Sequence, residues 1–302
     1  MRPSYQIMDE LESINIYLRD AIHPEKRNAE ANDKTVNMLK AIKIKAVQHG
    51  DQEIAKLVWC YEQILKVQQN YIVSFNEMKA GAYYQAWCLL ERVRIEIGFL
   101  EPHCTLSTRD DNYKLEYIEK HTEQFQSLFP YKLFISPAFL YLEKKCSICD
   151  QVISLRNPCG HKIGEIYDGE MCSHVITKVD ILEVSVVPNP VQKYSVLFVT
   201  DSKTGQQTDH YDYSLVKYAI GGLRAPFDTW DIRWTKIRHP HSLFEHISPN
   251  DNCPCDSGKK YQDCCLKEIG VLRPHVELLF SVPPPEDLLK IVYPEYRDHK
   301  EP

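Results

Sequence analysis

The stretch NDNCPCDSGKKYQDCC, from Asn250 to Cys265, packs four cysteines into sixteen residues. So few residues bury too little apolar surface to hold a fold by themselves. Cys253 and Cys255 are followed, after eight residues, by Cys264 and Cys265. Four thiolates around one ion form the tetrahedral site typical of structural Zn²⁺. The sequence therefore predicts a closed zinc site, and the bound metal would supply the folding energy of the segment.

The residues between the ligands suit a tight loop around a metal. Gly258 can adopt the left-handed backbone conformation that turns the chain back toward the ion. Lys259 and Lys260 partly offset the charge of about −2 that four thiolates and one Zn²⁺ leave. We expect the exposed part of this loop to form a small basic and aromatic surface that binds a protein partner. Its predicted members are Asn252, Lys259, Lys260 and Tyr261.

These sixteen residues resemble the SEC-C motif, a small zinc-binding module that ends the SecA translocation motor and occurs in many otherwise unrelated bacterial proteins. The resemblance rests on the four cysteines, the Asn-Cys-Pro-Cys start at Asn252, and the Ser-Gly-Lys-Lys-Tyr run from Ser257. Two features differ: Asp256 stands where the family usually has glycine, and 37 further residues follow Cys265. The whole chain is similar to bacterial SEC-C proteins with a helical front and a central cysteine site.

The resemblance implies zinc binding and a protein partner. In the translocation motor the module docks the tetrameric export chaperone SecB, and in other settings it is linked to ribosomes. The rest of the chain does not resemble a motor, because the phosphate-binding pattern G-x-x-x-x-G-K-[ST] is absent. The resemblance favours a zinc-binding adaptor that docks a SecB-like chaperone or the ribosome. It leaves open a chaperone-dependent toxin–antitoxin or phage-defence component.

A second group of cysteines lies in the middle of the chain, where Cys-x2-Cys is followed after nine residues by Cys-x-His. A Cys-x2-Cys turn points two thiolates at one ion, and a second short-spaced pair completes a tetrahedron. Cys172 is a possible substitute ligand, most plausibly for His161, unless it packs beside the site with His174. A redox Cys-x-x-Cys is a weaker alternative, because no βαβ pattern surrounds it. The predicted ligands of this second structural zinc are Cys146, Cys149, Cys159 and His161.

The bulk composition indicates a globular protein without a membrane span. The 302 residues are 43% apolar and 26% charged, and no apolar run approaches the length that crosses a bilayer. The first residues lack the apolar core of a secretory signal. We therefore expect a cytoplasmic protein whose eleven cysteines mainly bind metal instead of forming disulfides. The formal charge of −6 becomes about −9 with two zinc sites, which argues against nucleic acid as a partner.

The chain shows two sequence patterns in succession, helical periodicity followed by β-branched runs, and together they predict an α+β fold. Apolar residues recur at helical spacing through the front of the chain, as in Leu11, Ile14 and Leu18. β-Branched runs at Val179–Val187 and Tyr194–Asp201 then predict a small antiparallel sheet. The predicted domains are a helical bundle at 1–135, a zinc-stabilised β domain with a zinc-ribbon-like site at 136–245, the SEC-C module at 246–270, and a proline-rich tail at 271–302 with one helical turn at 287–292.

Catalysis is the less favoured hypothesis. Ser185 lies in a predicted strand with histidines upstream, but the nucleophile-elbow signature G-x-S-x-G is absent. Basic residues alternate with Trp234 between Arg233 and His239 and can stack nucleic-acid bases, but the same pattern gives the two faces of a strand. Enzyme activity stays open, with an adaptor preferred. The remaining enzyme hypothesis is an open metal site in the histidine-rich residues before the SEC-C motif, although a polar run of this kind more often forms a solvated loop. Its candidate ligands are His239, His241, Glu245, His246 and Asp251.

Overall fold

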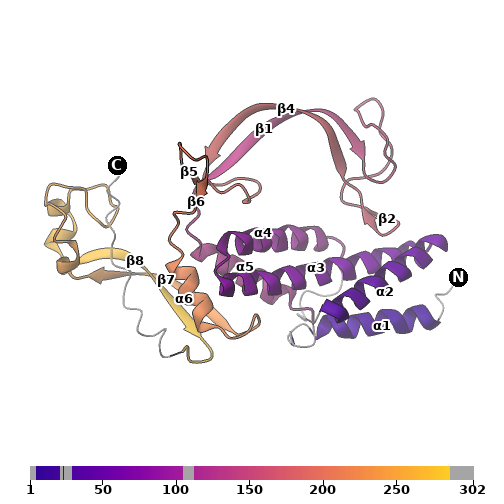
Figure 1. Cartoon of the computed structure of the whole chain (residues 1–302), viewed down its shortest axis with the longest axis horizontal. Helices are drawn as coiled ribbons and strands as arrows, with labels where there is room; N and C mark the ends of the chain where they lie inside the picture. Colours follow the sequence, from indigo (N-terminus) through magenta and orange to yellow (C-terminus); the bar gives the residue numbers. More distant parts are fainter. Residues whose placement is uncertain (1–4, 21–22, 24–28, 105–111, 286–302) are drawn as a thin grey trace. The chain divides into compact units, whose positions relative to one another are not determined.

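The computed structural model describes residues 5–20, 23, 29–104 and 112–285 (Figure 1). These residues form two compact units, and the boundary between the units falls after Ile220. The fold is α+β, with five helices at the front of the chain followed by two-stranded antiparallel pairs, two of them long and two very short. Among the described residues, no helix is both long enough and apolar enough to cross a membrane.

The first unit begins with helices that pack around an apolar core, as predicted. Ile14 and Leu18 of the first helix are buried. The third helix has well-defined ends: the Asp51 carboxylate accepts a hydrogen bond from the Ile54 N–H (3.1 Å), and Gly81 closes the other end with φ +81°. The five helices are α1 (Tyr5–Arg19), α2 (Ala29–Gln48), α3 (Gln52–Ala80), α4 (Tyr83–Leu100) and α5 (Leu115–Leu128).

A long two-stranded ribbon follows the helices (Figure 1). Strand β1 (Phe134–Cys146) pairs antiparallel with β4 (His174–Val187), and Cys146 lies opposite His174. Three register shifts interrupt the pairing. Bulges of this kind bend a strand and increase its twist, in keeping with the curved ribbon of Figure 1. The predicted strand at Val179–Val187 is the second half of β4.

The segment that joins β1 to β4 carries a small hairpin that rests on the helices. Its strands are β2 (Ile166–Tyr167) and β3 (Glu170–Met171), and Asp168 in the turn has φ +51°. The side chain of Gln52, the first residue of α3, exchanges two hydrogen bonds with Asp168. The Gln52 Nε2 donates to the carboxylate (2.5 Å), and the Asp168 N–H donates to Gln52 Oε1 (3.0 Å). The hairpin is therefore tied to the start of α3.

Two further contacts hold the same hairpin. The Lys43 ammonium lies 2.6 Å from the Glu62 carboxylate and 3.0 Å from that of Glu170. Burial acts to lower the pKa of Lys43, but the two carboxylates outweigh it and raise that pKa. Gly169 has φ +71°, and a Cβ at this position would lie 3.1 Å from the Ala55 carbonyl oxygen. Glycine suits both the backbone conformation and the close approach.

After β4 the chain contains less strand than predicted. The predicted strand Tyr194–Asp201 is reduced to β5 (Val199–Thr200), which pairs with β6 (Gln207–Thr208). The segment just before β5 packs against α4 instead, where the Trp87 indole N–H donates to the Lys193 carbonyl (2.6 Å). The same segment also pairs briefly with the start of β1, where Val196 bridges Phe134 and the Ile135 N–H donates to the Ser195 carbonyl (2.8 Å).

The second unit is built on another two-stranded ribbon, β7 (Trp230–His239) paired with β8 (Val271–Phe280). It follows α6 (Ser214–Gly222), a helix not predicted from the sequence. Strand β8 corrects the prediction that residues 271–302 form an extended tail. The strand contains Pro274, which a strand with an open edge tolerates. The helical turn predicted at 287–292 lies outside the described residues.

The cysteine-rich loop is an insertion between β7 and β8. Residues 240–270 leave one strand and return to the other, so that His239 pairs with Val271. The division predicted at residue 245 therefore falls within one loop of a single ribbon. The described strands form four separate antiparallel pairs, in keeping with the small antiparallel β structure predicted from the sequence. The loop contains three 3₁₀ turns: η3 (His241–Phe244), η4 (Tyr261–Asp263) and η5 (Cys265–Lys267).

Candidate metal centres

The four C-terminal cysteines converge as predicted. The Sγ atoms of Cys253, Cys255, Cys264 and Cys265 lie within 4.8 Å of one another. Cys253 and Cys265 are buried, and the Sγ atoms of Cys255 and Cys264 are 3.5 Å apart. Zinc binds thiolate sulfur at about 2.3 Å in a tetrahedron. Sulfur atoms at the spacing observed here can surround an ion at that distance. The cluster can hold one metal ion.

Short backbone hydrogen bonds bring the two cysteine pairs together. The Cys253 N–H donates to the Lys259 carbonyl (2.7 Å), and the Cys264 N–H donates to the Tyr261 carbonyl (3.1 Å). Between the pairs, Gly258 has φ +72°, the left-handed conformation predicted for it. The loop therefore reverses direction through its own backbone hydrogen bonds and Gly258, and this reversal brings the ligands near one another.

Asp256, where glycine is usual in the SEC-C motif, adopts a left-handed backbone conformation. Its φ is +61°, a left-handed value that aspartate tolerates better than most residues. The carboxylate accepts a hydrogen bond from the Arg273 guanidinium (2.9 Å), which also donates to the Pro254 carbonyl. The aspartate thus offsets part of its backbone strain by tying the loop to β8.

Tyr261 was predicted to lie on the exposed surface, but it is buried at 3% exposure. Its hydroxyl lies 2.6 Å from His241 Nδ1, and His241 Nε2 lies 2.9 Å from the Glu268 carbonyl oxygen. A short metal loop still needs apolar filling, and this tyrosine packs with Phe244, Val271 and the buried cysteines to supply it. The other residues predicted for the partner surface are exposed: Asn252, Lys259 and Lys260.

The histidine-rich run before the motif does not assemble into the open metal site considered above. His241 is held by Tyr261 and Glu268, and the Asp251 carboxylate accepts a hydrogen bond from the Ser248 N–H (2.9 Å). Within the described chain, the two cysteine clusters are the groups whose potential ligand atoms converge. His241 instead supports the cysteine loop, a role that its spacing in the sequence does not reveal.

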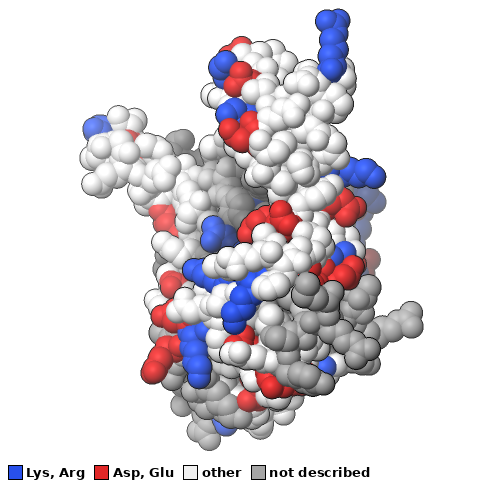
Figure 2. Space-filling view, turned by 90° about the vertical axis from the view of Figure 1, so that its right-hand side faces the viewer, with Lys and Arg blue, Asp and Glu red and all other residues white. Residues whose placement is uncertain are grey.

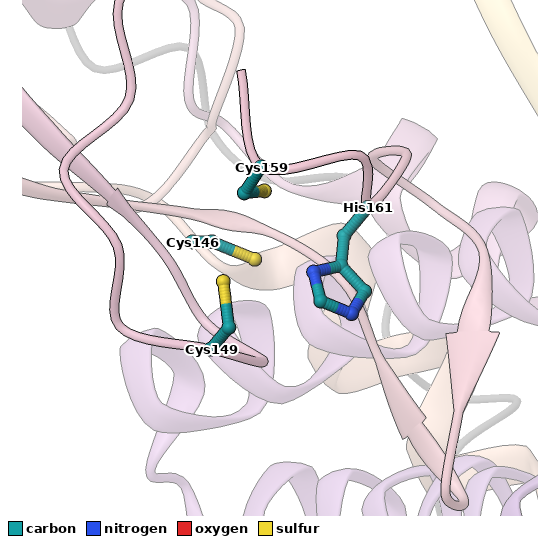
Figure 3. A group of neighbouring side chains, drawn as sticks. All are labelled: Cys146, Cys149, Cys159 and His161. Carbon is teal, nitrogen blue, oxygen red and sulfur yellow. The ribbon is translucent and has the colours of Figure 1, made fainter. Parts of the chain in front are cut away.

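The central cluster also forms, at the end of the β1–β4 ribbon (Figure 3). Cys146 is the last residue of β1, Cys149 lies in the turn that follows, and Cys159 and His161 come from the loop leading to β2. Their ligand atoms lie within 4.8 Å of one another. In Figure 3 the three thiols and one edge of the imidazole face a common point. This cluster can hold a second metal ion.

His161 fits the fourth ligand position. Its Nδ1 is buried and lacks a hydrogen-bond partner among the described residues. A buried polar atom without a partner costs free energy, and a metal ion in the cluster would satisfy it. The Tyr167 ring packs edge-on against the imidazole at 4.7 Å, and its hydroxyl accepts a hydrogen bond from the Lys162 N–H (3.1 Å). These contacts fix the orientation of the imidazole.

Cys172, considered as a substitute for His161, lies beside the cluster. It is buried, and its Sγ is 3.9 Å from that of Cys146, but it is not one of the four residues that converge. Burial and the neighbouring Cys146 thiol raise the pKa of Cys172 to about 11. The structure therefore assembles the set with His161 and places Cys172 against its buried side.

Each cluster contains one thiol that ionises readily. For Cys146, burial acts to raise the pKa, but the Cys149 and Ile148 N–H groups outweigh it and lower that pKa to about 6. For Cys255, burial is outweighed by hydrogen bonds with Ser257 and neighbouring thiols, and the pKa is again about 6. Metals bind the thiolate, so both clusters are prepared for a soft cation.

The donor sets suit zinc in a structural role. One cluster offers four thiols, and the other offers three thiols and an imidazole. Four protein ligands fill a tetrahedral Zn²⁺ and leave no position for a reactive water. The metal would then hold together segments of chain, and the geometry gives it no reaction to perform.

The residues considered for serine catalysis and for nucleic-acid binding have ordinary structural contacts. The Ser185 hydroxyl donates to Glu183 on the same face of β4 (3.3 Å). On the β7–β8 ribbon, Arg233 pairs with Glu277 and Arg238 pairs with Glu268, each at 3.3 Å. These carboxylates offset the positive charge that a nucleic acid would need. Figure 2 shows lysine and arginine interspersed with aspartate and glutamate on one face of the protein.

Comparison with known proteins identifies the C-terminal cluster. Residues 250–267 match the family model of the SEC-C motif, and this span contains all four converging cysteines. No curated protein and no solved structure matches the chain. The chain therefore carries a SEC-C motif, a zinc-binding module, together with a second cluster of metal-binding geometry outside it.

Proposed function

We propose that the protein is a cytoplasmic zinc-dependent adaptor whose SEC-C module docks an acidic surface of a SecB-like chaperone or of the ribosome. The observation that carries the proposal is the placement of Lys259 and Lys260. Both are exposed on a loop whose conformation four converging cysteines fix. A bound metal would order the backbone that carries the two lysines before a partner docks, so less backbone entropy is lost on binding.

The rest of the architecture suits an adaptor. Both metal sites are closed by protein ligands, which favours scaffolding over catalysis. A small basic surface gives weak binding on its own and relies on electrostatic attraction. Binding of this type falls as salt rises, because the Debye length shortens. A partner with several equivalent sites would strengthen it through multivalency.

The test uses the full zinc-loaded chain, immobilised and exposed separately to a purified SecB-type tetramer and to ribosomes over a range of salt. The charge-reversal variant Lys259→Glu/Lys260→Glu should weaken binding by at least tenfold at low salt, with zinc content unchanged. The control Lys203→Glu/Lys217→Glu reverses two exposed lysines elsewhere and should bind like the parent.

Equal binding by the parent and the Lys259→Glu/Lys260→Glu variant would contradict the proposal, as would an absence of binding to both probes. Binding to only one of the two probes decides between the chaperone and the ribosome as the partner. The zinc measurement separates loss of the charged surface from loss of the fold.

A further inference from the structure

The β1–β4 ribbon has one apolar face that nothing in the described chain covers. In an antiparallel pair, residues opposite each other share a face, and faces alternate along the strand. Four cross-strand pairs on one face are apolar throughout: Ile135 with Val186, Pro137 with Val184, Phe139 with Ile181, and Tyr141 with Val179. The opposite face is mixed: Ser136 lies opposite Ser185, while Ala138 and Leu140 lie opposite the carboxylates of Glu183 and Asp180.

This apolar face is exposed to an unusual degree. Ile181 is 66% exposed, Val184 63%, Tyr141 61% and Val186 56%. With side-chain areas typical of these residues, the exposed part of the face amounts to about 600 Å², at the upper end for the largest patch on a monomer. An isolated two-stranded ribbon is also marginally stable in water. Both facts indicate that the face is buried in the functional state of the protein.

The edges of the ribbon are poorly suited to accept a further strand. The outer edge of β1 is occupied near both ends, where the Ile135 N–H donates to the Ser195 carbonyl (2.8 Å) and the Ile153 N–H donates to the Lys144 carbonyl (2.9 Å). On β4 the register shifts leave Leu182 and Thr177 unpaired as bulges. Bulges disfavour edge-to-edge pairing. Contact through the apolar face is therefore favoured over addition of a strand.

We infer that this face packs against the same face of a second copy of the chain, in a two-fold symmetric homodimer. The four pairs carry no charged side chain, so they select against a charged partner and match each other. Two copies would bury about 1,200 Å², the lower end of the range for specific stable interfaces. Two ribbons facing one another about 10 Å apart form a small β-sandwich with a closed apolar interior.

The dimer goes beyond the proposed function, because it needs neither the SEC-C module nor its partner. The test measures the mass of the full zinc-loaded chain by sedimentation velocity and light scattering from about 1 to 100 μM, the range in which interfaces of this size associate. The parent should form a concentration-dependent dimer. The variant Ile181→Lys/Val184→Lys should raise the dimer dissociation constant by at least tenfold.

A matched control places two lysines on the opposite face, Leu140→Lys/Ser185→Lys, at positions whose cross-strand partners are Asp180 and Ser136. This control adds the same charge to the same strands and should dimerise like the parent. A milder variant, Ile181→Thr/Val184→Thr, keeps strand-forming residues and should also weaken the dimer. Zinc content and circular dichroism should be unchanged in all three variants.

A monomer at every concentration would overturn the inference and leave the face to a different partner or to another part of the same chain. A dimer that survives both Ile181/Val184 variants would place the interface elsewhere. Equal dissociation in the Leu140/Ser185 control would show a general charge effect and would equally overturn the inference.

Discussion

The two cysteine clusters use the same chemistry in different structural settings. The SEC-C loop is closed on itself: its own backbone hydrogen bonds join the cysteine pairs, and Tyr261 fills the space beneath them. The central cluster sits at the end of a long ribbon, and the hairpin beside it rests on the helices through Gln52 and Lys43. A closed donor set alone does not say what a metal stabilises. The surrounding contacts decide whether it stabilises one loop or the attachment of one element to another.

The largest expected effect follows from removing one ligand at each cluster. Cys264→Ser and Cys149→Ser should each lower the zinc content by one ion per chain, because three remaining ligands bind far more weakly and the metal supplies folding energy. Elemental analysis measures the zinc, and Cys88→Ser, a scattered half-buried thiol, is the control. Loss of both ions in either variant would show that the two clusters fold as one.

The next effect separates a ligand from a neighbour at the central cluster. His161→Ala should lower zinc affinity by more than about 100-fold, because it removes a ligand, whereas Cys172→Ala should change it by less than about tenfold. Competition with a chelator measures both affinities. The opposite ranking would make Cys172 the fourth ligand and would leave the buried Nδ1 of His161 unexplained.

A smaller effect tests whether the central cluster depends on its attachment to the helices. Gly169→Ala should destabilise the first unit by about 1–2 kcal/mol, because it adds a strained φ and a close contact with Ala55. Gly205→Ala has nearly the same φ, +69°, with no atom within 4 Å, so it should cost less. Thermal unfolding measures both. Equal costs would mean that the close approach contributes nothing.

The smallest effect concerns the departure from the usual SEC-C pattern. Asp256→Gly should change stability by no more than about 0.5 kcal/mol, because relief of the left-handed backbone offsets loss of an exposed ion pair with Arg273. Asp256→Ala loses the ion pair and keeps the strain, so it should cost about 1 kcal/mol. Zinc-loaded protein unfolded in denaturant gives both values. A larger loss of stability in Asp256→Gly than in Asp256→Ala would contradict this account.

The metal ligands could be predicted from the sequence because each set lies within a short span. Spacing alone limits where Cys253 and Cys265, or Cys146 and His161, can go. The supporting residues could not be predicted in this way. Gln52 and Asp168 are separated by 116 residues, and no local pattern marks them as partners.

The fold shows the same limit. The helical character of the front of the chain was predictable because apolar residues such as Leu11, Ile14 and Leu18 repeat locally. Strand β8 was missed because its partner β7 lies beyond the whole cysteine loop. Tyr261 was assigned to the surface because a polar, lysine-rich neighbourhood suggests exposure, whereas the metal loop needed an aromatic residue inside.

The insertion of the cysteine loop between β7 and β8 has an evolutionary consequence. The loop departs and returns at one cross-strand pair, His239 and Val271, so its two attachment points are adjacent. Two strands joined by residues 240–270 follow the same path as two strands joined by a two-residue turn. Such a segment is portable: a gene can gain, lose or exchange it without altering the host fold. A designed hairpin that carries residues 240–270, with Val271 and Arg273 at the matching strand positions, would accordingly acquire a zinc site.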